Sequence, residues 1–170
     1  MRDEDADVSG PGSGDALTLT ATARAQPAAL WRSLTERREQ WWPGMRFDAE
    51  PGAALREEWT EDGQVRIATG VVLESSPGVR LAFAWQQPEW EAPLRVVFSL
   101  APAPDGTVVR LHETGFAALG VGARLLGEHL EGWRFHLANL AAHAEDDERG
   151  HAPERWNEGV SAVHLDRIRP

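Results

Sequence analysis

Apolar side chains recur at every second position over much of the chain, which is the period of a β-strand with one buried face. The segments that follow this pattern are 17–23, 65–73, 81–85, 94–100 and 109–111. Arg80 and Arg95 fall on the opposite face, so we expect antiparallel strands that bury only one side. Candidate turns built on Gly or Pro lie at Pro51-Gly52, Asp62-Gly63, Pro77-Gly78 and Asp105-Gly106. They predict a series of hairpins.

Helical patterns flank this strand region. Pro27 suits the first turn of a short helix in which Leu30 and Leu34 lie one turn apart and face inward. A second short helix is predicted over 36–42, ended by Pro43-Gly44. Near the C-terminus the apolar period changes to about three and a half, at Leu126, Leu130, Trp133, Leu137, Leu140 and Ala144. This stripe predicts a long helix over about 120–145 that covers the buried face of the sheet.

The order of elements predicts one α+β domain. A chain of 170 residues is long enough for one domain and one hydrophobic core. Residues 1–15 combine charge with Gly, Ser and Pro, and we expect a flexible tail there. The folded domain is expected over 16–145, followed by a polar C-terminal extension over 146–170.

The charge of the chain limits its partners. A formal net charge of -10 argues against binding to phosphate backbones or to anionic lipid. No segment approaches the roughly 20 consecutive apolar residues that span a bilayer, and the acidic, Gly-rich N-terminus is unlike a signal peptide. We therefore expect a cytoplasmic protein with no nucleic-acid partner and no membrane insertion.

Several kinds of chemistry are excluded by composition. The chain has no Cys, no Tyr and no Lys, so thiolate and Schiff-base catalysis are excluded. It also has no phosphate-binding loop and no dinucleotide fingerprint, and we expect no cofactor. His129, His136 and His143 recur every seven residues, but that step separates them by about 10 Å along a helix. Zinc holds its ligands at roughly 2 Å, so we predict no metal site.

Five phrases of the sequence occur in an order typical of a known group. They are residues 30–44, the Pro51-Gly52 turn, and residues 62–86, 105–116 and 131–145. In combination they resemble the START-like (SRPBCC) superfamily, in its branch of heat-shock-protein-90 ATPase activator homologues. The resemblance implies a helix-grip, Bet v 1-like fold: two short helices follow the first strand, and a curved antiparallel sheet wraps around the long C-terminal helix.

The resemblance also implies a ligand cavity between the sheet and the long helix. Members of the superfamily bind lipids, sterols, polyketides or plant hormones there, and some catalyse cyclisation or aromatisation. Where many relatives have His before the Gly-Phe pair that ends the last strand, this chain has Glu113. Glu113 alternates with Val109 and Leu111, so we expect its side chain on the inward face.

We predict a set of ligand-binding residues from these positions. They are Trp41, Trp42, Trp59, Phe83, Trp85, Phe98, Glu113, Phe116, Leu126, His129 and Trp133. Simple core filling is an open alternative for the aromatic members. We expect Trp41 and Trp42 to line the opening of the cavity, because adjacent residues of a helix diverge by about 100° and only one can face the core.

Glu113 is the candidate for specific chemistry. A carboxylate that faces an apolar cavity is suited to act as a general acid or base, or to hold a ligand amine or hydroxyl. The alternative is a structural ion pair with an Arg at the end of the sheet. His129 and His136 flank Trp133, and we favour surface or half-buried positions for them over a contact with the pocket.

Three hypotheses for function follow, in order. The first is a binding domain that holds an apolar or amphipathic small molecule, such as a lipid or polyketide, without turnover. The second is an enzyme of the polyketide cyclase or aromatase kind with Glu113 as its acid or base. The third is a chaperone-associated interaction domain. A homodimer or another protein partner is left open.

Overall fold

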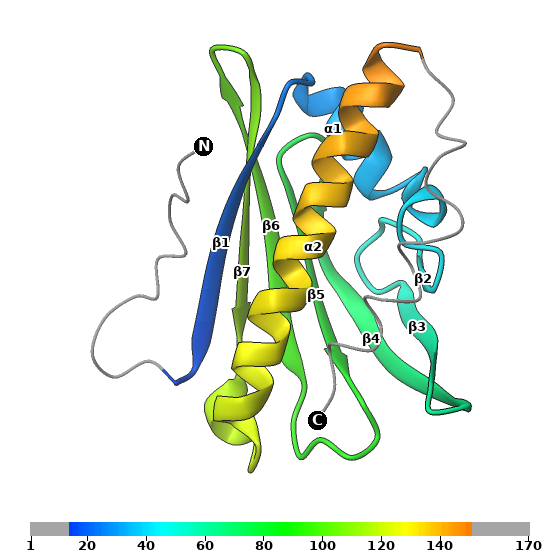
Figure 1. The fold of residues 1–170 in the computed structure, drawn as a ribbon, viewed down its shortest axis with the longest axis vertical. Coiled ribbons are helices and arrows are strands. Elements are labelled where there is room, and N and C mark those ends of the chain that lie inside the picture. The colour runs from blue at the N-terminus through cyan, green and yellow to red at the C-terminus, as the bar shows by residue number, and fades with distance from the viewer. Residues whose placement is uncertain (1–13, 151–170) are drawn as a thin grey trace.

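The computed structural model describes residues 14–150, which form a seven-stranded antiparallel sheet and a long helix that lies across one of its faces (Figure 1). The elements in chain order are β1 Ala16–Ala23, α1 Pro27–Leu34, η1 Arg38–Gln40, β2 Met45–Phe47, β3 Ala54–Glu61, β4 Gln64–Ser76, β5 Arg80–Gln86, β6 Leu94–Ala103, β7 Gly106–Thr114, η2 Phe116–Ala118 and α2 Gly122–Glu148. This is the predicted helix-grip architecture. The predicted N-terminal tail and C-terminal extension lie largely outside the described residues.

The strand order β1-β7-β6-β5-β4-β3-β2 joins neighbouring strands by hairpins except at one end. There β1, the first strand, pairs with β7, the last, and Leu19 lies opposite Leu111. Next to this pair, the Asp15 carbonyl accepts hydrogen bonds from the amides of Gly115 and Phe116. The chain therefore returns to its start before α2 begins.

The predicted turns are confirmed. Gly52, Gly63, Gly78 and Gly106 all have positive φ, a conformation that side chains other than glycine rarely adopt. At Gly106 a Cβ atom would also lie 2.0 Å from the Ala23 carbonyl oxygen, so this hairpin needs glycine for space as well as for φ.

The predicted inward face of β4 is wrong. Val65, Val71 and Leu73 face outward, and Val65 is 60% exposed. Ala68 and Val72 are buried instead. Small residues line the inner face of β4, and the rings of Phe83 on β5 and Phe47 on β2 lie 6.2 Å apart between ring centres although β4 and β3 separate those strands. The apolar residues that set the sequence pattern are left on the outer face.

The second short helix predicted over 36–42 is reduced to the 3-10 turn η1. Arg38 is buried there and donates hydrogen bonds to the carbonyls of Met45 and Thr35, at 2.8 and 3.1 Å. Its guanidinium also stacks 3.9 Å from the centre of the Phe47 ring. Burial lowers the pKa of Arg38 to about 10. These contacts fix the chain in a bend that an α-helix cannot follow.

α1 is held against the C-terminal half of α2 (Figure 1). The Arg24 and Gln26 amides, just before α1, donate to carboxylates of Glu145 and Glu148 on α2, at 2.7 and 2.9 Å. Acidic side chains at a helix N-terminus satisfy its free amides and favour its dipole. The end of α2 therefore caps the beginning of α1.

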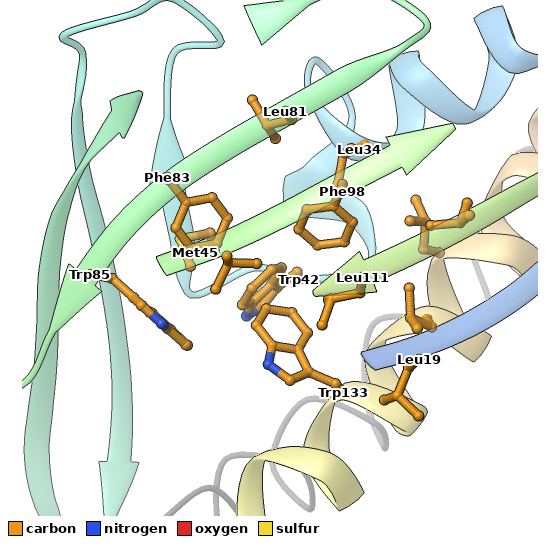
Figure 2. Packing of buried hydrophobic residues seen from close by; sticks show 14 of the residues in the cluster. Leu19, Leu34, Trp42, Met45, Leu81, Phe83, Trp85, Phe98, Leu111 and Trp133 are labelled. Atoms are coloured by element: carbon orange, nitrogen blue, oxygen red, sulfur yellow. The ribbon is translucent and has the colours of Figure 1, made fainter. Parts of the chain in front are cut away.

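The core lies between the sheet and α2 (Figure 2). The predicted stripe of α2 is confirmed from Trp133 onward, but its first turns are rotated from the expectation. Leu125 and His129 are fully buried, whereas Leu126 and Leu130 only pack against the core from half-buried positions. The first turn of α2 packs closely on the Phe116 carbonyl group, and this requires glycine at position 122, because a Cβ there would lie 2.0 Å from the carbonyl oxygen.

Candidate functional site

A carboxylate lies at the centre of the aromatic interior. Glu113 on β7 is 0% exposed, as its alternation with Leu111 predicts. The indole N–H of Trp85 donates to its Oε1 at 3.0 Å, and the indole N–H of Trp133 donates to its Oε2 at 2.7 Å. The Nδ1 atom of His129 lies 2.9 Å from the same Oε2. No arginine of residues 14–150 forms an ion pair with Glu113, so within the described residues the predicted alternative of an Arg ion pair is not found.

Three elements position this cluster. Glu113 lies opposite Val96 on β6, and Trp85 comes from β5 on the far side of that strand. Trp133 and His129 lie one turn apart on α2 and reach the carboxylate from the other layer. The sheet and the helix therefore meet through polar contacts in a region that is otherwise apolar.

The aromatic rings around the cluster touch one another. Trp133 lies 5.9 Å from Trp85 and 5.8 Å from Phe98, measured between ring centres, and Phe83 lies 5.9 Å from Trp85. Figure 2 shows these rings gathered beneath the strands. The four aromatic residues and Glu113 were all predicted as site residues, and the structure brings them together.

A second buried carboxylate, Glu57 on β3, was missed by the sequence prediction. It is buried, and its Oε1 accepts the indole N–H of Trp42 at 2.8 Å. Burial raises the pKa of Glu57 to about 7, opposed by the Trp42 hydrogen bond and by His129 and reinforced by Glu113. The signal was present, because Glu57 alternates with the inward Leu55.

Trp41 and Trp42 are both buried, so the expectation that only one of them could face the core is wrong. They follow the 3-10 turn and are not neighbours on an α-helix, which removes the 100° argument. The indole N–H of Trp41 donates to the Ser33 carbonyl at 2.7 Å. His136 lies beside this pair, 4.1 Å from Trp42 between ring centres. Neither Trp lines an exposed rim.

His129, His136 and His143 of α2 are all buried, so the expectation of surface or half-buried positions for His129 and His136 is wrong. His143 Nδ1 lies 2.8 Å from Ser33 Oγ, and its Nε2 lies 2.8 Å from Gln40 Oε1. Burial, and then the charge of Arg37, lower the pKa of His143. His143 therefore joins α2 to α1 and η1. Within the described residues, no group of three or more His, Asp or Glu side chains is placed to hold a metal ion.

The remaining predicted residues lie towards the end of the sheet at which α2 begins. Phe116 contacts His129, with ring centres 5.5 Å apart. Trp59 on β3 is buried, and Trp90, in the β5–β6 connection, lies 5.7 Å from His129 between ring centres. Sequence reasoning missed Trp90 because it falls in a turn outside every periodic segment. In the described part of the chain, the indole nitrogens of Trp59 and Trp90 and the Nε2 atom of His129 are buried without a hydrogen-bond partner.

The outer face of the sheet carries a separate hollow. Its volume is about 240 Å³, and it is lined by Arg80, Val97, Ser99, Arg110 and His112. His112 faces outward, and its Nδ1 lies 2.8 Å from Thr18 Oγ1. This hollow is on the opposite side of the sheet from Glu113 and is not the predicted cavity.

Comparison with known proteins gives a family model and a common fold. The model described as Activator of Hsp90 ATPase homolog 1-like protein matches residues 24–145. A comparison with curated proteins gave no match. No helix of the described residues is both long and apolar enough to cross a membrane.

Solved structures with the same fold come from several bacteria. Protein MLL2253 from Mesorhizobium loti has 25% identity and a TM-score of 0.63, over 75% of this chain and 95% of that one. CalU16 from Micromonospora echinospora has 19% identity and a TM-score of 0.59, over 89% and 88% of the two chains. DynU16, a protein of the dynemicin biosynthetic locus, has 20% identity and a TM-score of 0.63, over 82% of this chain and 50% of that one.

Proposed function

The chain belongs to the family of Activator of Hsp90 ATPase homolog 1-like proteins, and from this premise we propose that it is a START-like binding domain for an apolar or amphipathic small molecule held between the sheet and α2. The observation that carries the proposal is the position of Glu113. A fully buried carboxylate holds two indole N–H groups and a histidine in the middle of an aromatic interior.

The buried cluster around Glu113 is less favourable for stability than an apolar core of the same size would be. A buried ionisable group loses its hydration, and well-packed apolar residues in its place are often neutral or stabilising. A ligand site needs a different arrangement, with apolar walls and a small number of fixed polar groups. The interior of this protein has that composition, with Trp85, Trp133 and Phe98 as walls and His129, oriented by Glu113, as the fixed polar group. The ligand in this proposal is a lipid, a polyketide or a molecule of similar character.

Titration with a panel of fatty acids, sterols and aromatic polyketides tests the proposal. Trp85 and Trp133 touch the cluster, so a ligand there changes the tryptophan fluorescence, and it raises the melting temperature by mass action. The fluorescence change should persist in Trp31→Phe, because Trp31 lies in α1 and is not among the residues that hydrogen-bond Glu113. If no member of the panel changes either signal in the wild-type protein, the proposal is wrong.

The second candidate is an enzyme of the cyclase or aromatase kind, supported by the contact of Glu113 with His129. Both carboxylate oxygens of Glu113 already accept indole N–H groups. This geometry suits Glu113 to orienting His129 better than to touching a substrate. Glu113→Gln tests the candidate once a bound compound is converted, since unchanged turnover would exclude Glu113 from the mechanism.

A further inference from the structure

We propose that the interior site takes a ligand hydroxyl, of a phenol, an enol or an alcohol, between His129 Nε2 and the indole N–H of Trp90. This inference rests on the proposed binding function and specifies its ligand. It also makes His129 the proton acceptor of the site and Glu113 the group that positions it.

The two nitrogen atoms belong to neighbouring rings that are both buried. His129 is 0% exposed and Trp90 is 5% exposed. Their ring centres lie 5.7 Å apart, and both His129 Nε2 and Trp90 Nε1 lack a hydrogen-bond partner within the described residues. We place the hydroxyl oxygen between these two neighbouring rings, at the ordinary hydrogen-bond distance of about 2.7–3.2 Å from each nitrogen. A buried polar atom without a hydrogen-bond partner destabilises the folded protein, so the pair favours an occupant that satisfies both.

The hydrogen-bond roles select a hydroxyl. An indole N–H can only donate, so Trp90 requires an acceptor. We assign the imidazole proton of His129 to Nδ1, because Nδ1 faces the acceptor oxygen of Glu113. The Nε2 atom of a neutral imidazole then carries a lone pair and requires a donor. A hydroxyl accepts from Trp90 and donates to His129, whereas an ether or a ketone only accepts and leaves Nε2 unsatisfied.

The surroundings favour an aromatic hydroxyl. The ring of Phe116 lies edge-on to His129 at 5.5 Å, and Trp85 lies 5.9 Å from His129 on another side. Aromatic rings pack well in both arrangements. The Glu113–His129 pair also has the geometry of a carboxylate that orients an imidazole as a general base. A proton taken from the hydroxyl would reside on Nε2, while Nδ1 on the other side of the ring keeps its contact with Glu113, and the proton would return to the same oxygen.

Three small probes of similar size test the inference: phenol, anisole and toluene. Phenol donates and accepts, anisole only accepts, and toluene does neither. Binding to the wild-type protein is measured by ligand-observed NMR. A hydrogen bond worth about 1 to 1.5 kcal/mol corresponds to roughly a 10-fold preference, so we expect phenol to bind about 10-fold more tightly than anisole. The indole N–H of Trp90 donates to phenol and anisole alike, so the preference of both over toluene should fall several-fold in Trp90→Phe and persist in Trp31→Phe.

A second measurement needs no ligand. Nitrogen-15 NMR of the histidine side chains reports which ring nitrogen carries the proton. At pH 7.5 we expect the His129 ring to carry one proton, on Nδ1, and none on Nε2. A doubly protonated His129, or equal binding of phenol and anisole, would overturn the inference and leave the proposed binding function in place. If no probe and no member of the lipid and polyketide panel binds, both are wrong. The wild-type comparisons decide the question even if Trp90→Phe does not fold.

Discussion

Glu57 offers a direct test of the buried cluster through the pH dependence of stability. Its carboxyl group is buried beside Trp42, and burial raises its pKa from 4.5 to about 7. Between these values the folded protein binds more protons than the unfolded chain. The contribution of Glu57 to the free energy of unfolding is therefore greatest below pH 4.5, and this contribution is lost as the pH rises through 7.

The change is large enough to measure. A rise in pKa from 4.5 to about 7 corresponds to about 3 kcal/mol in total, of which about 2–3 kcal/mol falls between pH 5 and pH 8. Glu57→Gln keeps an oxygen that can accept the Trp42 N–H and cannot ionise. We therefore expect Glu57→Gln to become more stable relative to wild type by about 2–3 kcal/mol as the pH rises from 5 to 8.

Urea unfolding followed by tryptophan fluorescence gives the free energy of unfolding of both proteins at each pH. Glu58→Gln is the matched control, since Glu58 is exposed on the opposite face of β3 and pairs with Arg56. Its difference from wild type should stay nearly constant over this range. If Glu57→Gln also runs parallel to wild type from pH 5 to 8, Glu57 does not change its charge in the folded protein, and the reasoning from burial fails.

Three further predictions concern other parts of the structure. Glu113→Ala should lower the free energy of unfolding by about 3–5 kcal/mol, because it leaves buried indole and imidazole groups unpaired; urea unfolding measures this. Ser33→Ala should lower the free energy of unfolding by about 1–2 kcal/mol above pH 7, because His143 loses a buried partner. Because the pKa of His143 is lowered in the folded protein, the stability of the wild type should fall as the pH drops below 6.5. Gly122→Ala should destabilise by about 1–3 kcal/mol or more, since its Cβ would lie 2.0 Å from a backbone oxygen, whereas Gly127→Ala should stabilise by about 1 kcal/mol because the same helix has open space there.

Each of these has its own contrary result. If the free energy of unfolding of Glu113→Ala were within about 1 kcal/mol of wild type, the hydrogen bonds of Glu113 would not stabilise the fold as argued. If the loss in free energy of unfolding caused by Ser33→Ala did not diminish as His143 becomes protonated at low pH, the effect of the hydroxyl would not depend on its contact with the imidazole. Equal melting temperatures of the two glycine variants would remove the steric argument for Gly122.

The fold was predictable because two periods dominate the sequence. Strict alternation around Phe83 and Phe98 identified the buried face of β5 and β6, and the same rule placed Glu113 inside. The rule failed in β4, where Val71 faces outward. An apolar residue on a strand does not by itself identify the core, and the inner face of β4 is filled by neighbouring side chains above small residues such as Ala68.

The site was only partly predictable because polarity was taken as evidence of exposure. Glu57 was not among the predicted site residues and His143 was considered only as a metal ligand, yet each is satisfied by a partner distant in the sequence, Trp42 or Ser33. Such partners can be identified only once the layers are assembled. The aromatic residues were easier, because their size alone favours burial.

The pairing of β1 with β7 has a consequence for synthesis of the chain. Thr18 and its contact His112 are 94 positions apart. At about 5–20 residues per second, β1 therefore leaves the ribosome roughly 5–20 s before its partner strand exists. During that interval its alternating apolar face has no sheet to join, and an unpaired strand is a site for association with other chains. Nascent protein stalled before β7 is thus the form most exposed to aggregation and to capture by chaperones.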